Sequence, residues 1–245
     1  MSGHSKWHNI QAKKGKTDAA RGAIFTKLGR ELAVAAKSNP NPETNSKLAD
    51  VIAKAKAANM PNDNIKRSIA KAAGELSGKD YKELTYEGYG VCGSAVIIVT
   101  LTDNVNRTSG DISSTMSKCG GQMGKPGCVS YQFDNKGVIV IEKTVKLDED
   151  TMMEYCLEGG AEDFTSDDDV YEVYTTPENF SNVRQYFEGK GVTFLEAEVK
   201  MIPQNYITLP EDKVATFQKM LDKLDELDDV QNVYHNVELP EEDDE

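Results

Sequence analysis

Apolar residues recur every three or four positions along the first third of the chain, which is typical of short amphipathic helices. The spacing predicts helices over residues 18–37, 45–58 and 61–73, separated by segments that contain proline or asparagine. The expected apolar stripe of the first helix consists of Ile24, Leu28, Leu32 and Ala35. The three segments together predict a small helical domain.

From residue 81 onward, β-type patterns alternate with helical ones. Between 137 and 201 the order is strand, helix, strand, strand, helix, strand, the split βαβ order of ferredoxin-like folds. The expected strands are 137–143, 163–165, 170–174 and 192–201, and the expected helices are 148–157 and 177–187.

The segments on either side of this unit each carry half of the same pattern. Strand 94–101, helix 105–118 and strand 128–133 precede it, after a turn expected at 86–90. Strand 206–209, helix 210–227 and strand 230–239 follow it. Joined, the two halves predict a second ferredoxin-like domain into which the first is inserted, with one larger α+β sheet as the alternative.

The expected fold is therefore a multidomain α+β protein, with an N-terminal three-helix domain followed by two α+β domains, one inserted in the other. The expected boundaries are a basic arm and helical domain at 1–80, a discontinuous α+β domain at 81–134 plus 204–240, an inserted α+β domain at 135–203 and an acidic tail at 241–245.

Charge is distributed unevenly between these parts. Residues 1–80 contain 15 Lys and Arg against 7 Asp and Glu, a net charge of +8. Residues 81–245 contain 13 against 34, a net charge of −21, which gives −13 for the whole chain. A basic head on an acidic body predicts a polyanionic partner for the head; the alternative is that the Lys-rich helices are only solvated surfaces.

The first 17 residues contain no acid and hold the only tryptophan, Trp7, next to Lys6. An aromatic ring among cations can stack on an exposed base while the cations neutralise phosphates, although Trp7 could also pack against the helices. The cations expected to contact phosphate are Lys6, Lys13, Lys14 and Lys16 in the arm, and Arg21, Lys27 and Arg30 in the first helix.

Sequence motifs for catalysis or cofactor binding are weak. Gly88–Gly93 matches GxGxxG but precedes a strand, whereas a dinucleotide site needs these glycines after one. The four cysteines include no CxxC pair, and His4 and His8 have no third ligand nearby. We therefore expect no enzyme activity, metal, cofactor or small-molecule substrate. Without a long apolar segment or a secretory leader, a cytoplasmic protein with no membrane partner is expected.

Several short motifs closely resemble the YebC/PmpR family, whose mitochondrial relative is the translational activator of cytochrome c oxidase. They are Gly3-His4-Ser5-Lys6-Trp7, Arg21-Gly22, Ile24-Phe25-Thr26-Lys27, Tyr86-Glu87-Gly88-Tyr89-Gly90, Asp103-Asn104 with Asn106-Arg107-Thr108, Ser117-Lys118, and Gly159 with Ala161-Glu162-Asp163. The resemblance implies a non-enzymatic, three-domain protein, either a DNA-binding transcriptional regulator or a ribosome-associated factor that helps translation through difficult stretches such as consecutive prolines. The contacts it implies are His4, Ser5, Lys6, Trp7, Lys13, Lys14, Arg21, Lys27, Asn104, Asn106 and Arg107.

The chain departs from the family pattern mainly where cations are common, a departure expected of a paralogue with a different target. The departures are Ala23, Val91-Cys92, Val105 and Ser113-Ser114.

Of the two nucleic acids, RNA is favoured, since a flexible basic arm with one Trp suits splayed RNA bases and no helix-turn-helix spacing is evident. Ribosomal RNA is the leading expected target, DNA the alternative, and a protein–protein adaptor the remote one.

Overall fold

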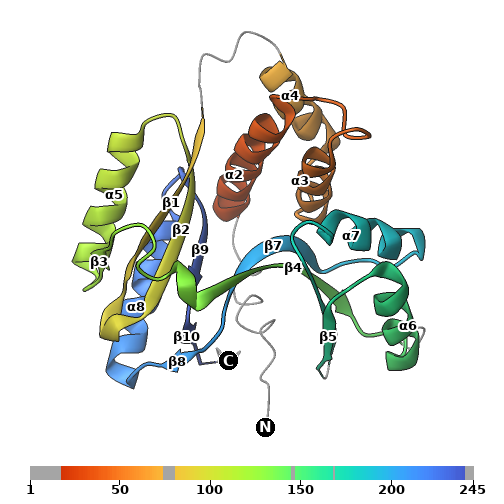
Figure 1. Ribbon diagram of the computed structural model, residues 1–245. Coiled ribbons are helices and arrows are strands. Elements are labelled where there is room, and N and C mark those ends of the chain that lie inside the picture. Colours follow the sequence, from red (N-terminus) through yellow and green to blue (C-terminus); the bar gives the residue numbers. More distant parts are fainter. Residues whose placement is uncertain (1–17, 74–80, 145–146, 168, 241–245) are drawn as a thin grey trace.

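The structure is a computed structural model that describes residues 18–73, 81–144, 147–167 and 169–240. Three helices form the head: α2 (Asp18–Ala36), α3 (Ser46–Ala57) and α4 (Asn62–Ala73) (Figure 1). The predicted helices are confirmed to within a residue or two at their ends. The head has its own hydrophobic cluster, which includes Leu28, Leu32, Leu48 and Ile65. Ile24, expected on the buried stripe, is instead 41% exposed.

Asn45 links the first two helices of the head. Its side-chain oxygen accepts a hydrogen bond from the backbone N–H of Leu48 at 3.1 Å, which caps the start of α3. Its side-chain nitrogen donates to the carbonyls of Ala35 and Asn39 at 2.8 and 2.7 Å. One polar side chain therefore satisfies orphan groups at the end of one helix and the start of the next.

The inserted α+β unit has the predicted element order. Its elements are β4 (Phe133–Glu142), α6 (Glu149–Gly159), β5 (Asp163–Ser166), β6 (Val170–Thr175), α7 (Phe180–Gly189) and β7 (Glu196–Pro203). The strands lie in the order β5-β6-β4-β7 and every pair is antiparallel. Residues from α6 and α7, such as Met152 and Phe187, bury one face of this sheet. The ferredoxin-like prediction is confirmed here.

The outer α+β unit is built from segments on both sides of the insertion. Its elements are β1 (Lys82–Tyr89), β2 (Ala95–Thr102), α5 (Val105–Lys118), β3 (Gln122–Met123), α8 (Glu211–Asp225) and β9 (Val230–His235). The strand order is β3-β1-β2-β9. Antiparallel pairing of β2 with β9 joins segments that the whole inserted unit separates in sequence. The nested α+β architecture is therefore the observed one, while the exact domain boundaries stay a prediction.

Three details of the outer unit differ from the prediction. Residues 86–90 were expected to turn, but most of them belong to β1. Residues 128–133 were expected to form a strand, but 130–132 form a 3-10 turn and the strand begins at Phe133. Segment 206–209 was expected to join the sheet, but its strand β8 (Ile207–Thr208) pairs in parallel with β10 (Val237–Glu238). The position between β3 and β2 that was expected for segment 206–209 is occupied by β1.

With β1 in that place, the two α+β units have the same arrangement. Each central strand, β2 or β4, leads into a helix and then an edge strand, and the last strand, β9 or β7, follows a second helix. The difference is that β1 precedes β2, whereas β6 follows β4 and β5. In the outer unit, the strand equivalent to β6 thus comes first in sequence, while the other elements keep their order. The β4 and β7 strands of the inserted unit run across the middle of the molecule (Figure 1).

The misread segments 86–90 and 128–133 contact each other, and this contact explains both errors. Glu87 on β1 accepts hydrogen bonds from the backbone N–H groups of Gly127, Val129 and Ser130 at 2.8, 2.9 and 2.9 Å. These donors therefore bind a carboxylate and not a neighbouring strand. Gly88 lies so close to β3 that an added Cβ would come within 2.5 Å of the Gln122 carbonyl oxygen.

We expect Glu87→Gln to lower the free energy of unfolding by about 1–3 kcal/mol at pH 7, because an amide cannot accept from all three donors. Burial by itself raises the pKa of Glu87, but the hydrogen bonds from Val129, Gly127 and Ser130 outweigh it and the pKa is lowered. The carboxylate therefore stabilises the fold above its unfolded pKa, and the effect is lost as pH falls through the folded value.

Urea denaturation at pH 7 and at a series of lower pH values measures this effect. Glu83→Gln is the matched control, because Glu83 lies on the same strand with a side chain that is 57% exposed. A Glu87→Gln protein as stable as the Glu83→Gln protein at pH 7 would contradict the assigned role.

Candidate nucleic-acid interface

The predicted contacts in the arm lie outside the described residues. They are His4, Ser5, Lys6, Trp7, Lys13, Lys14 and Lys16. Arg21 belongs to α2, but its side chain is also outside the description. Nucleic-acid contact by these eight residues stays a prediction.

The remaining predicted cations meet at one corner of the molecule. Here α2 and the start of α5 approach the turn between α8 and β9. Asp225 at the end of α8 and the turn residues Glu226, Asp228 and Asp229 form what we call the acidic corner. Three of these acids, Glu226, Asp228 and Asp229, line a recess of about 430 Å³ together with Arg30 and Arg107. The structure thus brings together residues that are far apart in sequence, but it places acids between the cations.

The α2 cations are engaged by this acidic corner. Lys27 Nζ lies 2.8 Å from Asp225 Oδ1 and donates to the Asp225 carbonyl at 2.7 Å. Arg30 Nη1 lies 2.8 Å from Asp229 Oδ1 and also donates to the Asp228 carbonyl. Both side chains are mostly buried, with 12% and 16% exposed. Their charges therefore hold the head against the outer unit.

Asp229 is the centre of the corner. Its Oδ2 accepts from Arg107 Nη2 at 2.6 Å and from Thr108 Oγ1 at 2.7 Å, while Oδ1 accepts from Arg30. Burial by itself raises the pKa of Asp229, but the hydrogen bonds from Arg107 and Thr108 and the nearby charges outweigh it, so the pKa is lowered. A single ionised carboxylate thus joins α2 to the first turn of α5.

The first turn of α5 contains the other predicted contacts. Asn104 caps the helix, its side-chain oxygen accepting from the backbone N–H of Arg107 at 3.1 Å. Asn106 is exposed. The Arg107 side chain is 46% exposed even though it pairs with Asp103 and Asp229, which leaves part of its guanidinium open to solvent. Asn104 therefore has a structural role, and Arg107 can combine a structural role with binding.

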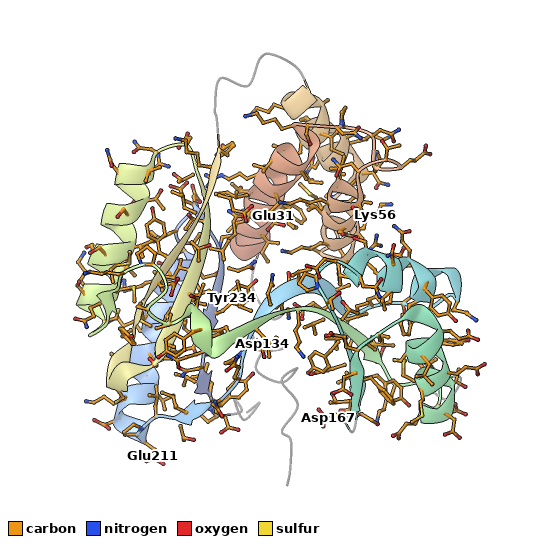
Figure 2. The ribbon with its side chains drawn as sticks, viewed as in Figure 1. Glu31, Lys56, Asp134, Asp167, Glu211 and Tyr234 are labelled. Atoms are coloured by element: carbon orange, nitrogen blue, oxygen red, sulfur yellow. The ribbon has the colours of Figure 1, made fainter. Side chains whose placement is uncertain are left out.

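A second group of cations, none of them among the predicted contacts, is exposed on the surface of the head. Its members are Lys56 on α3 (labelled in Figure 2) and Lys66, Arg67 and Lys71 on α4. All four are exposed, and none forms an ion pair with any residue that the structure describes. The sequence signal for the α4 cations is their position away from the apolar residues Ile65 and Ile69. Unlike Lys27 and Arg30, these cations are available to a partner.

Other candidate chemistry has structural explanations. Within the described ranges, no group of three or more His, Cys, Asp or Glu side chains is placed to hold a metal ion. His235 packs edge-on against Phe217 with ring centroids 5.2 Å apart. Burial raises the pKa of the Cys156 thiol to about 11, which keeps it protonated. None of the helices in the described part of the chain has the length and apolar composition needed to cross a bilayer.

We expect Asp229→Asn to lower the free energy of unfolding at pH 7 by about 1–3 kcal/mol, because it weakens partly buried hydrogen bonds from two arginines and a buried one from Thr108. Since the pKa of Asp229 is lowered in the folded protein, the carboxylate stabilises the fold above its unfolded pKa. The difference should disappear as pH falls through the folded value.

Asp228→Asn serves as the control, because the Asp228 side chain is 74% exposed and lies 3.9 Å from Arg30. Surface pairs of this kind contribute little, so its unfolding curve should match that of the unmodified protein. Equal effects of the two substitutions would contradict the central position of Asp229.

Comparison with known proteins covers both the head and the α+β units. Residues 5–75 match the model of the TACO1/YebC protein N-terminal domain, and residues 81–237 match that of the TACO1/YebC second and third domain. A probable transcriptional regulatory protein of Hathewaya histolytica, ORF2U, is 59% identical over 98% of both chains. Another from Clostridium botulinum (strain Eklund 17B / Type B), CLL_A1008, is 60% identical over 98% of both.

The fold is also similar to that of a solved structure. The conserved hypothetical protein Aq1575 from Aquifex aeolicus superposes with a TM-score of 0.84 at 42% sequence identity, covering 97% of this chain and 98% of that one. The family models, the relatives and this structure agree with the resemblance seen in the short motifs. The chain belongs to the TACO1/YebC family.

Proposed function

We propose that this protein is a non-enzymatic regulator of gene expression that binds nucleic acid through its basic head. The observation that carries the proposal is the group of four exposed cations on α3 and α4, Lys56, Lys66, Arg67 and Lys71, which form no ion pair with the residues that the structure describes. They lie in a part of the chain with a net charge of +8, on a protein whose remaining residues have a net charge of −21. Such an arrangement attracts a polyanion to one end and repels it from the rest.

The RNA form of this proposal assigns the protein to the ribosome, where it would relieve stalling at difficult sequences such as consecutive prolines. The argument is physical and rests on the arm. Trp7 can stack on a splayed base while Lys6, Lys13, Lys14 and Lys16 neutralise phosphates. His4, Ser5, Arg21, Asn106 and the open edge of Arg107 are proposed as further contacts. A cytoplasmic location stays a prediction.

The DNA form has two supports of its own. The relatives at 59–60% identity are named probable transcriptional regulatory proteins. In addition, only residues 58–61 separate α3 from α4, a connection of the length found in helix-turn-helix motifs, and α4 presents Lys66, Arg67 and Lys71 outward. The predicted helices 45–58 and 61–73 already implied a short connection, although they were not interpreted as a helix-turn-helix motif. A protein–protein adaptor is the remaining alternative, for which nucleic-acid binding would be dispensable.

Retention of the purified protein on ribosomes at about 0.15 M salt, where exposed charges are screened over about 8 Å, tests the two forms. The full chain is compared with a truncation that begins at Asp18, with and without excess duplex DNA. Binding that needs the arm and survives the DNA is the expected result. Release by DNA would favour the transcriptional form, and absence of binding to either would favour the adaptor.

The triple variant Lys66→Ala, Arg67→Ala and Lys71→Ala should weaken binding to the preferred nucleic acid. Each phosphate contact that is lost should make the slope of log binding constant against log salt concentration less negative by about 0.7–0.9. A fluorescence titration at several salt concentrations measures both quantities.

The matched control replaces three exposed cations of the acidic outer unit by alanine, namely Lys118, Lys219 and Lys223. It makes the same change in net charge but leaves the head intact, so affinity should change little. If both triple variants have the same salt slope, long-range charge and not the α4 surface determines binding.

A further inference from the structure

The head and the two α+β units meet around a cavity of about 390 Å³. Residues of α2 and α3 line one side, β1, β2 and β9 a second, and β7 a third. Figure 2 labels Glu31 of α2 and Tyr234 of β9, which contribute to two of these sides. We call the residues around this cavity, together with the neighbouring Glu196 of β7, the junction. No residue of the acidic corner lines the cavity, so the head meets the body at two separate places.

Ion pairs cross the junction from α3 to β7. Lys54 Nζ of α3 lies 3.0 Å from Glu198 Oε2 and 3.3 Å from Glu31 Oε1. Lys200 Nζ lies 2.5 Å from Glu196 Oε1 and 3.7 Å from Glu198 Oε1. All five side chains are mostly buried, with exposed fractions between 9% and 28%. Three carboxyl groups therefore share two ammonium groups where little water is present.

The polar groups of the closed junction are not all satisfied. Glu196 Oε2 is buried and has no hydrogen-bond partner among the described residues. The same holds for both polar atoms of the Gln231 amide, which lines the cavity. Buried polar atoms without partners destabilise the state that buries them. Water would satisfy these atoms if the junction opened.

Glu196 and Glu198 form a close pair of carboxyl groups. They are two residues apart on β7, so their side chains leave the same face of the strand. Burial, followed by the charge of Glu198, raises the pKa of Glu196 to about 7, and Lys200 offsets only part of this shift. Burial by itself raises the pKa of Glu198, but the charges of Lys54 and Lys200 outweigh it and lower the pKa. The proton of the pair therefore resides mainly on Glu196, and the two groups titrate as a unit.

We propose that the junction is a pH-sensitive contact, kept closed by the proton that the Glu196–Glu198 pair holds and loosened when that proton is lost. Loss of the proton leaves three buried carboxylates against the two ammonium groups of Lys54 and Lys200. A buried charge without its own partner is costly, and opening of the junction hydrates it. The contact between the head and the α+β units is thus weaker in alkaline than in acidic solution.

The other charged groups of α3 at the junction have partners of their own. Lys47 Nζ lies 3.7 Å from Glu83 Oε2 of β1, where both side chains are exposed. Asp50 Oδ1 accepts from Arg184 Nε of α7 at 2.9 Å. Both pairs consist of groups that are normally ionised at neutral pH, so they hold α3 in place without responding to the proton of the Glu196–Glu198 pair.

The remaining titratable groups on this face do not neutralise Glu196. Lys136 of β4 lies opposite Lys200 in the strand register, but it forms no ion pair with any residue that the structure describes. Glu172 of β6 lies one strand beyond β4 and accepts a hydrogen bond from the Tyr174 hydroxyl. Burial and the charge of Glu198 raise the pKa of Tyr234, which keeps its hydroxyl neutral near pH 7. The change of charge near neutral pH is therefore assigned to the carboxyl pair.

The direction of the pH effect follows from proton binding. The pKa of the Glu196 carboxyl is about 7 in the closed junction, compared with an ordinary value of 4.5. The closed state therefore binds more protons between these two values. Its stabilising contribution is complete below the lower value and is lost as pH rises through the higher one. Between pH 6 and pH 8, the equilibrium constant for opening should rise about tenfold.

An NMR titration of the full-length protein from about pH 5 to about pH 9 tests the proposal. It follows the carboxyl carbons of the glutamate side chains and the backbone amides of Lys54 in the head and Tyr234 in the outer unit. One carboxyl signal, assigned by its absence from Glu196→Gln, should titrate with a midpoint near 7. Both amides should change with the same midpoint, because the junction joins all three units, and these changes should be absent from Glu196→Gln.

Urea denaturation at pH 6 and pH 8 measures the energetic effect. The unfolding constant of the unmodified protein, divided by that of Glu196→Gln, should rise about tenfold between the two pH values, because glutamine stays neutral at both. Glu142→Gln is the matched control, since Glu142 is an exposed residue of β4 in the same sheet. The ratio of the unmodified protein to Glu142→Gln should not change with pH.

Three results would overturn the proposal. The first is a titration of the unmodified protein in which every carboxyl midpoint lies below about pH 5.5, and it holds whether or not Glu196→Gln folds. The second is a titration confined to β7, with the amides of Lys54 and Tyr234 unaffected. The third is a pH effect that persists in Glu196→Gln and so belongs to another group, such as His235. None of these measurements uses nucleic acid, so the outcome is independent of the function proposed above.

Discussion

The pairing of β2 with β9 is the contact on which the rest of the structure depends. The chain leaves the outer sheet after β3, builds the whole inserted unit, and returns through α8 to place β9 beside β2. The backbone N–H of Leu101 donates to the Asp229 carbonyl at 2.8 Å just before β9 begins. Because side chains alternate between the faces of a sheet, a shift of one residue would exchange the two faces of β9. The same register therefore positions Asp229 in the acidic corner and Gln231 at the cavity.

The cations of the head have two different roles in this protein. Where the basic head faces the acidic units, partly buried pairs connect them: Lys27 with Asp225, Arg30 with Asp229, Lys54 with Glu198, and Asp50 with Arg184. Lys56 of α3 and the cations of α4, in contrast, are exposed and form no ion pair with any residue in the described part of the chain. The head is thus held to the body through one of its surfaces and keeps its unpaired cations on another. Exposed pairs contribute little to stability, so the buried carboxylates matter most to this arrangement.

The relation between the two α+β units explains how the cavity arises. Each sheet has helices packed on one face, α5 and α8 on the outer sheet and α6 and α7 on the inserted one. The other face of the outer sheet, which includes Ala95 and Ile97, packs against Phe133 of β4 and Met201 of β7. Further along, residues from this face, from β7 and from the head leave a space that they do not fill. The cavity is therefore a consequence of three bodies meeting, and no single unit contains it.

The sequence by itself determined the local structure and the general plan. Helix 105–118 was predicted with the observed bounds, and the order of elements was enough to identify the inserted ferredoxin-like unit, because periodicity reports which side of an element is buried. The sequence also revealed the charge difference between head and body, and its short motifs identified the family. Segment 86–90 was misread as a turn because Gly88 is required by the close approach of β3, a contact that lies beyond any local pattern.

Only the tertiary structure decided what the individual charged and polar side chains do. Nothing near Lys27 or Arg30 in the sequence shows that their partners lie almost 200 residues later in the chain, at Asp225 and Asp229. In the same way, Gln231 is one more polar residue in a strand until the register of β9 against β2 leaves it unpaired and buried. Local spacing predicts which elements form, but whether a charge is shared with the protein or offered to a partner depends on contacts between elements that are distant in the chain.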